Sequence, residues 1–214
     1  NFQRFTLRSN IDAQLKKWLQ GGINFSFTYA KQKVGVDNNS IMNALMQQPS
    51  VAPTGPDGSY DGPDDVWMPD NALALAELIT NKNRKFNFRH NVYLEATIID
   101  GLKLRTEFSG DYNFNNYYYY MPDYKFGVRT QDIRTSKWTK TNTQYYSWRN
   151  LLTYKKTFAE KHNLDVMLGQ EISKSKYETQ VGTASGFLSN TTPDLSAGDI
   201  TTSTTTGFKN TNSI

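Results

Sequence analysis

Long segments in which apolar and polar residues alternate are the feature that most constrains how this chain folds. The clearest runs from Phe5 to Leu15, where odd-numbered residues are apolar apart from Ser9 and even-numbered residues are polar. Successive side chains of a β-strand point to opposite sides, so this segment has one apolar and one polar face. At roughly 3.3 Å per residue and a tilt near 45°, its eleven residues rise about 26 Å. That rise matches the apolar band of an outer-membrane barrel, whereas an ordinary soluble strand is about half as long.

Five further segments alternate in the same way, which predicts about six long strands. They are residues 23–33, 86–98, 102–114, 143–158 and a segment from 164 that fades after 177. Short polar turns join them in pairs, at 16–22, 99–101 and 159–163. Between the pairs lie three long hydrophilic loops, at about 34–85, 115–142 and 182–214.

The register at the second turn follows from the two faces. A two-residue loop at Asp100 and Gly101 would pair Ile98 with Lys103 and place apolar side chains opposite polar ones. We therefore expect a three-residue loop with Ile98 opposite Leu102, and Gly101 in the left-handed region as part of a bulge.

The first long loop is expected to contain two short helices. One covers residues 40–48, and the other starts in the segment NALALAELIT with Asp70 or Asn71 as its cap. Four carboxylates between these helices could bind calcium, namely Asp57, Asp61, Asp64 and Asp65. Their spacing does not match an EF-hand, and Asp-Gly and Pro-Asp pairs are ordinary turn chemistry. The turn interpretation is preferred, so no metal and no cofactor is expected.

Composition removes several classes of protein. The mean hydropathy is -0.67, and no stretch approaches the ~18 consecutive apolar residues of a membrane-spanning helix. The net charge of +4 comes from scattered residues rather than a basic run interleaved with aromatics, so no nucleic-acid partner is expected. Cysteine is absent, which excludes disulfides, thiolate metal sites and Cys nucleophiles.

No catalytic constellation stands out, and we do not expect an enzyme. His90 and His162 are the only histidines, and neither has a Ser or carboxylate partner at motif spacing. Glu95 and Glu107 lie on the polar faces of neighbouring strands together with Arg89 and Arg105. A network of charges in a barrel lumen explains these four better than a glycosidase pair does.

Short turns at one end and long loops at the other are typical of bacterial outer-membrane barrels. The predicted fold is therefore all-β: a segment of an antiparallel transmembrane β-barrel with short periplasmic turns and long extracellular loops. Six strands are too few to close a barrel, so we expect residues 1–214 to be part of a larger one. The alternative is a soluble β-sandwich, a carbohydrate-binding or adhesive module whose apolar faces pack on each other.

Four segments resemble the SusC/RagA family of TonB-linked (TonB-dependent) outer-membrane proteins. They are RSNIDAQLKKWLQGGINFSFTYAKQ (8–32), QQPSVAPTGPDGSY (47–60), EATIIDGLKLRTEFSGDY (95–112) and LLTYKKTFAEKHNLDVMLGQE (151–171), and they occur in family order. The family's signal peptide, TonB box, plug and remaining strands have no counterpart in these residues.

The resemblance implies a large barrel, of about 22 strands, in the bacterial outer membrane. It implies import of glycan or peptide fragments with energy from TonB, whose contacts would lie outside this chain. The implied partners are a SusD-like surface lipoprotein, outer-membrane lipid and an oligosaccharide or peptide substrate.

Aromatic residues in the predicted outer loops are the candidate contacts for substrate or lipoprotein. They are Trp67, Tyr117, Tyr118, Tyr119, Tyr120 and Trp138. Such rings stack on sugars, although packing within the loops or a membrane girdle would also account for them.

Overall fold

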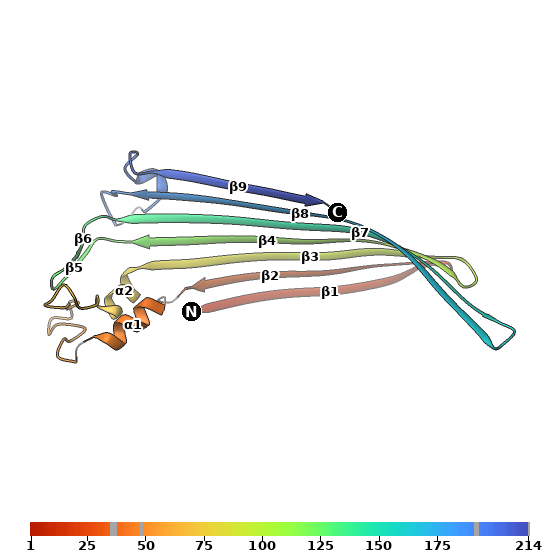
Figure 1. The fold of residues 1–214 in the computed structure, drawn as a ribbon, viewed down its shortest axis with the longest axis horizontal. Coiled ribbons are helices and arrows are strands. Elements are labelled where there is room, and N and C mark those ends of the chain that lie inside the picture. The colour runs from red at the N-terminus through yellow and green to blue at the C-terminus, as the bar shows by residue number, and fades with distance from the viewer. Residues whose placement is uncertain (35–37, 48, 191–192, 214) are drawn as a thin grey trace.

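The computed structural model describes residues 1–34, 38–47, 49–190 and 193–213, and for residues 38–40 the backbone alone. Within these ranges seven long strands form one antiparallel sheet, in which each strand pairs with the next along the chain (Figure 1). The strands are β1 (Phe2–Lys16), β2 (Leu19–Lys33), β3 (Thr80–Ile99), β4 (Leu102–Met121), β7 (Thr135–Phe158), β8 (His162–Ser185) and β9 (Thr204–Ser213). The order leaves β1 and β9 at the two edges of the sheet.

The remaining elements gather at one end of the sheet, opposite the three tight turns (Figure 1). They are α1 (Asn38–Met46), α2 (Ala72–Leu78), the two-stranded hairpin β5 (Tyr124–Phe126) and β6 (Arg129–Gln131), and the 3-10 turn η1 (Leu195–Ala197). None of the described helices is long and apolar enough to cross a bilayer.

The strand register confirms the predicted apolar face. One row of directly opposed residues crosses six strands: Ile11, Ile23, Val92, Phe108, Trp148 and Ile172. A slip of one residue anywhere would turn such a row to the other side of the sheet, so the alternation itself fixes the register. We call the side of the sheet that carries this row the apolar face, and the other side the polar face.

The apolar face lies open to the surroundings. The exposed fractions of Ile11, Trp148 and Leu168 are 53%, 52% and 70%, although all three lie within long strands. The two buried clusters of the described residues lie instead in the loop region, around Phe126 and around Phe187. The β-sandwich alternative is therefore wrong, because the only second sheet found in the described part of the chain is the small β5–β6 hairpin.

The outer limit of the apolar band does not lie on the same row in all strands. On β1 to β4 the band starts at the row of Phe5, Tyr29, Phe86 and Phe114, which continues to Glu178 on β8. On β8 it starts only at Ile172, six residues nearer the tight turns. The limit therefore stays on one row from β1 to β4 and moves toward the tight turns only beyond β4.

Two of the three tight turns preserve this alternation with a bulge. At the second turn Ile99 pairs with Leu102 and Thr97 with Lys103, so the extra residue is Ile98. The predicted three-residue loop and the pairing of Ile98 with Leu102 are therefore wrong, because the loop is Asp100 and Gly101 alone and the extra residue lies in β3. The expected bulge and the positive φ of Gly101 (80°) are present. The first turn has a similar irregularity between Gln14 and Lys16.

The predicted loop bounds need correction, because the strands extend beyond the apolar band. The three long loops cover 34–79, 122–134 and 186–203 rather than 34–85, 115–142 and 182–214. The predicted loop 182–214 contains β9, whose Ser, Thr and Asn residues show no alternation. The sheet therefore has seven long strands instead of the predicted six. His90 lies near the middle of β3.

The two helices form close to their predicted positions. The first spans Asn38–Met46 rather than 40–48, and Gln48 lies outside the described residues. Asn71 caps the second, since its side-chain oxygen accepts a hydrogen bond from the amide of Ala74 at 3.0 Å.

Candidate functional site

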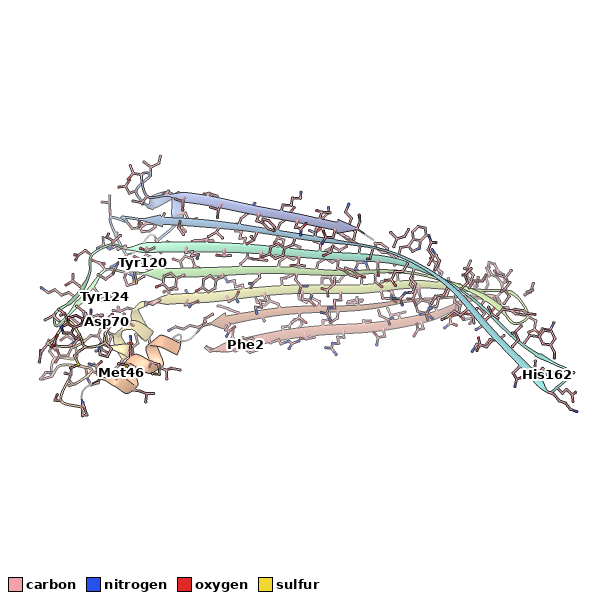
Figure 2. All side chains as sticks on the ribbon, in the orientation of Figure 1. Phe2, Met46, Asp70, Tyr120, Tyr124 and His162 are labelled. Atoms are coloured by element: carbon pink, nitrogen blue, oxygen red, sulfur yellow. The ribbon has the colours of Figure 1, made fainter. Side chains whose placement is uncertain are left out.

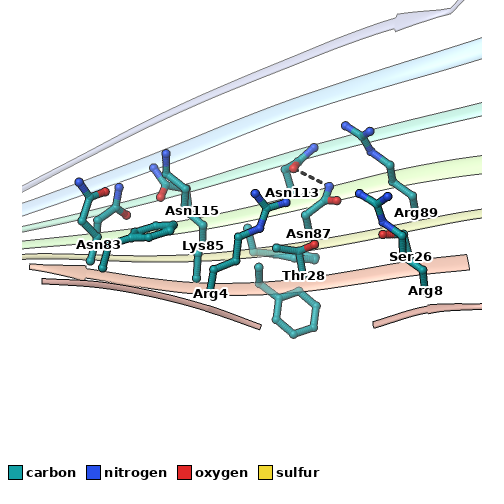
Figure 3. Close-up of a pocket in the computed structure, with 15 residues that line it drawn as sticks. Arg4, Arg8, Ser26, Thr28, Asn83, Lys85, Asn87, Arg89, Asn113 and Asn115 are labelled. Carbon is teal, nitrogen blue, oxygen red and sulfur yellow. Dashed lines mark hydrogen bonds between the residues drawn. The ribbon is translucent and has the colours of Figure 1, made fainter. Parts of the chain in front are cut away.

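A polar groove on the polar face is the candidate site (Figure 3). It has a volume of about 550 Å³ and lies across β1 to β4, in the half of the sheet nearer the long loops. Its polar lining consists of Arg4, Arg8, Ser26, Thr28, Gln32, Asn83, Lys85, Asn87, Arg89, Asn113 and Asn115. Alternation places these side chains on one face, because on each strand they are an even number of residues apart.

Asp111 anchors one side of the groove. Asn87 donates hydrogen bonds to Asp111 and Asn113, each at 2.7 Å, and Asn113 also donates to Asp111 at 2.9 Å. The guanidinium of Arg89 forms an ion pair with the other oxygen of Asp111 at 2.7 Å. This carboxylate is thus saturated by donors from two strands and holds the amides in fixed orientations.

The rest of the groove offers donors and acceptors that are not engaged. Within the described residues Arg4, Arg8 and Lys85 form no ion pair. The Oδ1 atoms of Asn83 and Asn115 are buried and accept no hydrogen bond. Buried amide oxygens usually have a partner, so these atoms await a donor from a ligand, water or another part of the protein.

A second polar cluster lies nearer the tight turns. Arg105 contacts Glu107 at 2.5 Å and Glu95 at 3.5 Å, and Lys103 contacts Glu95 at 2.9 Å. Arg149 joins Glu107 to Glu171, at 3.8 and 3.0 Å. The expected charge network is therefore present, except that Arg89 belongs to the groove instead. Glu95, Glu107 and Glu171 are thus each paired with at least one cation.

A third cluster ties two long loops together. Arg134 binds both oxygens of Asp123, at 2.7 and 2.8 Å, and donates to the carbonyl of Phe187 at 2.7 Å. Asn190 donates to Asp123 at 2.9 Å and accepts from the hydroxyl of Tyr120 at 2.6 Å. The hydrogen bonds from Asn190 and Arg134 hold the pKa of Asp123 below its ordinary value.

The six predicted aromatic contacts do not form one site. Tyr117 to Tyr120 lie in β4 and Trp138 lies in β7, so their predicted place in the loops is wrong. Alternation turns Tyr117 and Tyr119 to the polar face, and Tyr118 and Tyr120 to the other. Tyr118 packs edge-on against Trp138 at 5.1 Å between ring centroids. Tyr120 is buried against Phe187 at the loop end of the sheet, where Figure 2 labels it.

Trp67 alone of the six lies in a long loop, and 90% of it is exposed. Trp67 follows turns rich in aspartate, whose carboxylates accept hydrogen bonds from nearby backbone amides. The side chains of Asp57, Asp61 and Asp65 accept from the amides of Ser59, Gly62 and Trp67 at 2.8–3.0 Å. These are the bonds of ordinary turns, and those from Ser59 lower the pKa of Asp57. No group of three or more potential metal ligands occurs in the described parts of the chain.

The groove was not singled out in the sequence, although its residues lie on the faces predicted to be polar. The missing information was the register, because it decides which residue of β3 lies beside which residue of β1. Arg8, Ser26 and Arg89 become neighbours only once three strands are aligned.

Comparison with known proteins supports the resemblance drawn from short segments. No family model matches the chain. TonB-dependent receptor P39 of Formosa agariphila is 28% identical over 179 residues, which are 83% of this chain and 17% of the receptor. TonB-dependent receptor P26 of the same organism is 26% identical over an alignment of 231 residues, which covers 97% of this chain and 22% of the receptor.

Solved structures share the fold. A chain of the RagAB peptide transporter superposes with a TM-score of 0.81 at 18% identity, covering 98% of this chain and 24% of that one. The RagAB peptide importer in its closed-closed state gives 0.78 at 17% identity, covering 98% and 25%. The chain thus spans about a fifth of the length of the curated relatives it matches. Its resemblance to a segment of SusC/RagA-type TonB-dependent receptors is confirmed, and its all-β antiparallel fold is that of the corresponding part of RagAB.

Proposed function

We propose that residues 1–214 form part of the wall of a TonB-dependent transporter in the bacterial outer membrane. The observation that carries this proposal is the pair of unlike faces on one open sheet. A band of large apolar side chains is exposed on one face, while the other bears the groove and the charge network. Lipid covers the first and the lumen or plug meets the second, and further strands continue from the edges at β1 and β9.

The transported molecules are glycan or peptide fragments, and a SusD-like surface lipoprotein is the transporter's partner in their uptake. Relatives named as TonB-dependent receptors and a fold neighbour named as a peptide transporter support a transport role. These proteins are named as receptors and transporters, and the glutamates of the charge network are paired with cations.

The groove suits such cargo. Asparagine side chains donate to and accept from hydroxyl or peptide groups, and the unpaired cations Arg4, Arg8 and Lys85 attract carboxylates. Of the aromatic candidates we retain Trp67 as a contact for lipoprotein or substrate in the outer loops. Tyr117 and Tyr119 remain candidates on the lumen side.

Uptake by cells that make the intact protein tests the function. Labelled oligosaccharide or peptide fragments should accumulate in cells with active TonB and stop accumulating when TonB is deleted. Accumulation that persists unchanged without TonB would contradict the proposal, as would recovery of the protein in the soluble fraction.

A further inference from the structure

Basic residues follow the outer limit of the apolar band. On β2, β3 and β8 the first residue beyond the band on the apolar face is a cation, and so is the second. With one more residue on β7 these side chains are Lys31, Lys33, Arg84, Lys82, Lys174, Lys176 and Lys140. We call this set the outer cation row.

The outer cation row has little acidic compensation. Within the described residues none of its members forms an ion pair. Glu178, on the same face, is already paired with Lys209 at 3.2 Å. Asp194 lies close enough to affect Tyr118, at the loop side of the row. Among the described residues the row therefore carries a positive excess, which attracts anions.

A groove of about 450 Å³ opens in the middle of the row. Lys82, Arg84 and Lys140 line it together with Asn116, Tyr118 and Trp138. The indole Nε1–H of Trp138 is buried and donates to no atom of the described residues. On the loop side of Trp138, Leu195 of η1 packs over Gly182. Three cations thus line a groove whose wall includes an indole with an unused donor.

The distance of the groove from the apolar band indicates which ligand chemistry it meets. Arg84 and Lys82 lie two and four residues beyond Phe86, the last aromatic of the band on β3. At a tilt of 45° this places them roughly 5 and 9 Å outside the hydrocarbon, in the headgroup layer and at its outer boundary. Phosphate groups lie in that layer and pair well with Arg and Lys.

We propose that this groove binds the phosphorylated sugar headgroup of an outer-leaflet glycolipid. The inference rests on the proposed function, because it needs the long loops to face outward. Lys82, Arg84 and Lys140 bind a phosphate, the Trp138 indole donates to it, and the Tyr118–Trp138 pair packs against the sugar ring. The lipid would fasten strands β3, β4 and β7 to the membrane surface at the root of the long loops.

Native mass spectrometry of the intact protein, purified from outer membranes and stripped of lipid, tests this inference. The probe is bisphosphorylated lipid A, with fully dephosphorylated lipid A as its comparison. The variant K82Q/R84Q/K140Q removes three charges from the groove. The control K125Q/K137Q/K161Q removes three exposed charges from a loop, the polar face and a tight turn.

The groove variant should bind bisphosphorylated lipid A about tenfold more weakly or worse than the control does. Dephosphorylated lipid A should bind poorly to all three proteins. Equal affinity in groove variant and control would overturn the inference, as would no preference for the phosphorylated lipid. Heat-modifiable migration in gels shows separately whether each protein is an inserted barrel. A failure to insert counts against the proposed function, whereas insertion without lipid discrimination counts against the glycolipid site alone.

Discussion

Tyr93 lies across Gly22, the residue directly opposite it on the neighbouring strand. Its hydroxyl donates a 2.5 Å hydrogen bond to Asp12 one strand further on, and the guanidinium of Arg105 sits 4.0 Å from its ring centroid. A Cβ on Gly22 would collide with both the Tyr93 ring and the Asp12 carboxylate. A missing side chain on β2 thus allows one tyrosine to connect three strands and the charge network.

Gly22→Ala should lower the free energy of unfolding of the intact barrel by about 2 kcal/mol, because the Tyr93 ring must leave its place. Urea titration in detergent measures this change. Gly207→Ala is the matched control, since an added Cβ there meets no atom nearer than 3.8 Å. Equal effects of the two substitutions would show that the space above Gly22 is not needed.

Gly101 and Gly58 have the same φ of 80° but different surroundings. An added Cβ meets the carbonyl of Lys155 at Gly101 and nothing within 4 Å at Gly58. Alanine at Gly58 should therefore cost only the backbone strain, roughly 1–2 kcal/mol. Alanine at Gly101 should cost clearly more in the same unfolding assay, because the β3–β4 turn must also move away from β7. A smaller cost at Gly101 than at Gly58 would contradict the close contact between the turn and β7.

Acid should loosen the contact between the loops that contain Asp123 and Asn190. The pKa of Asp123 is lowered in the folded protein. Its contacts therefore stabilise the loops at pH values above 3.8, the ordinary pKa of the group. This stabilisation is lost as the pH falls through the lower, folded-state pKa. Spin labels at Leu188→Cys and Lys125→Cys report the separation of the two loops by pulsed electron resonance.

The distance distribution between these labels should be narrow near pH 6 and broaden as the pH falls below 3.8. Asp123→Asn should give a broad distribution at every pH, because the bidentate pairing with Arg134 is gone. A distribution that stays narrow in the variant would show that other contacts hold the loops.

Removing the unpaired cations of the polar groove should change the preference among substrates. Arg4→Gln, Arg8→Gln and Lys85→Gln together are expected to weaken uptake of acidic fragments relative to neutral ones by a factor of about five, about 1 kcal/mol. Competition between acidic and neutral peptides or oligosaccharides in TonB-active cells measures the ratio. An unchanged ratio would mean that these cations meet the plug or other protein groups rather than cargo.

The strand faces could be predicted from the sequence wherever apolar and polar residues alternate, as at Ile11, Val92 and Phe108. Alternation stops where the strands leave the apolar band, and there the prediction stopped too. Tyr117 to Tyr120 continue β4 with the same residue type on both faces, so no pattern marks them as strand. In β9, Phe208 is the only large apolar residue, and pairing with β8 rather than its own sequence defines the strand.

The sites depended on relations between strands. Lys31 and Arg84 are distant in sequence and look like scattered surface charge, yet they are directly opposed in the sheet. The bulge at Ile98 shows the same limit on a smaller scale. The need for an odd residue could be deduced from the two faces, but its position depends on how the turn packs against β7.

The most direct test of the account is a scan of single spin labels along β3, from Phe86 to Leu94, in the intact protein in membranes. We predict that collisions with oxygen, which concentrates in lipid, peak at every second position, namely Phe86, Phe88, His90, Val92 and Leu94. The intervening positions should be less accessible to oxygen, whether they meet water or the plug. Oxygen accessibility without a period of two, or with its maxima at Asn87, Arg89 and Asn91, would contradict the assignment of this sheet as a membrane wall.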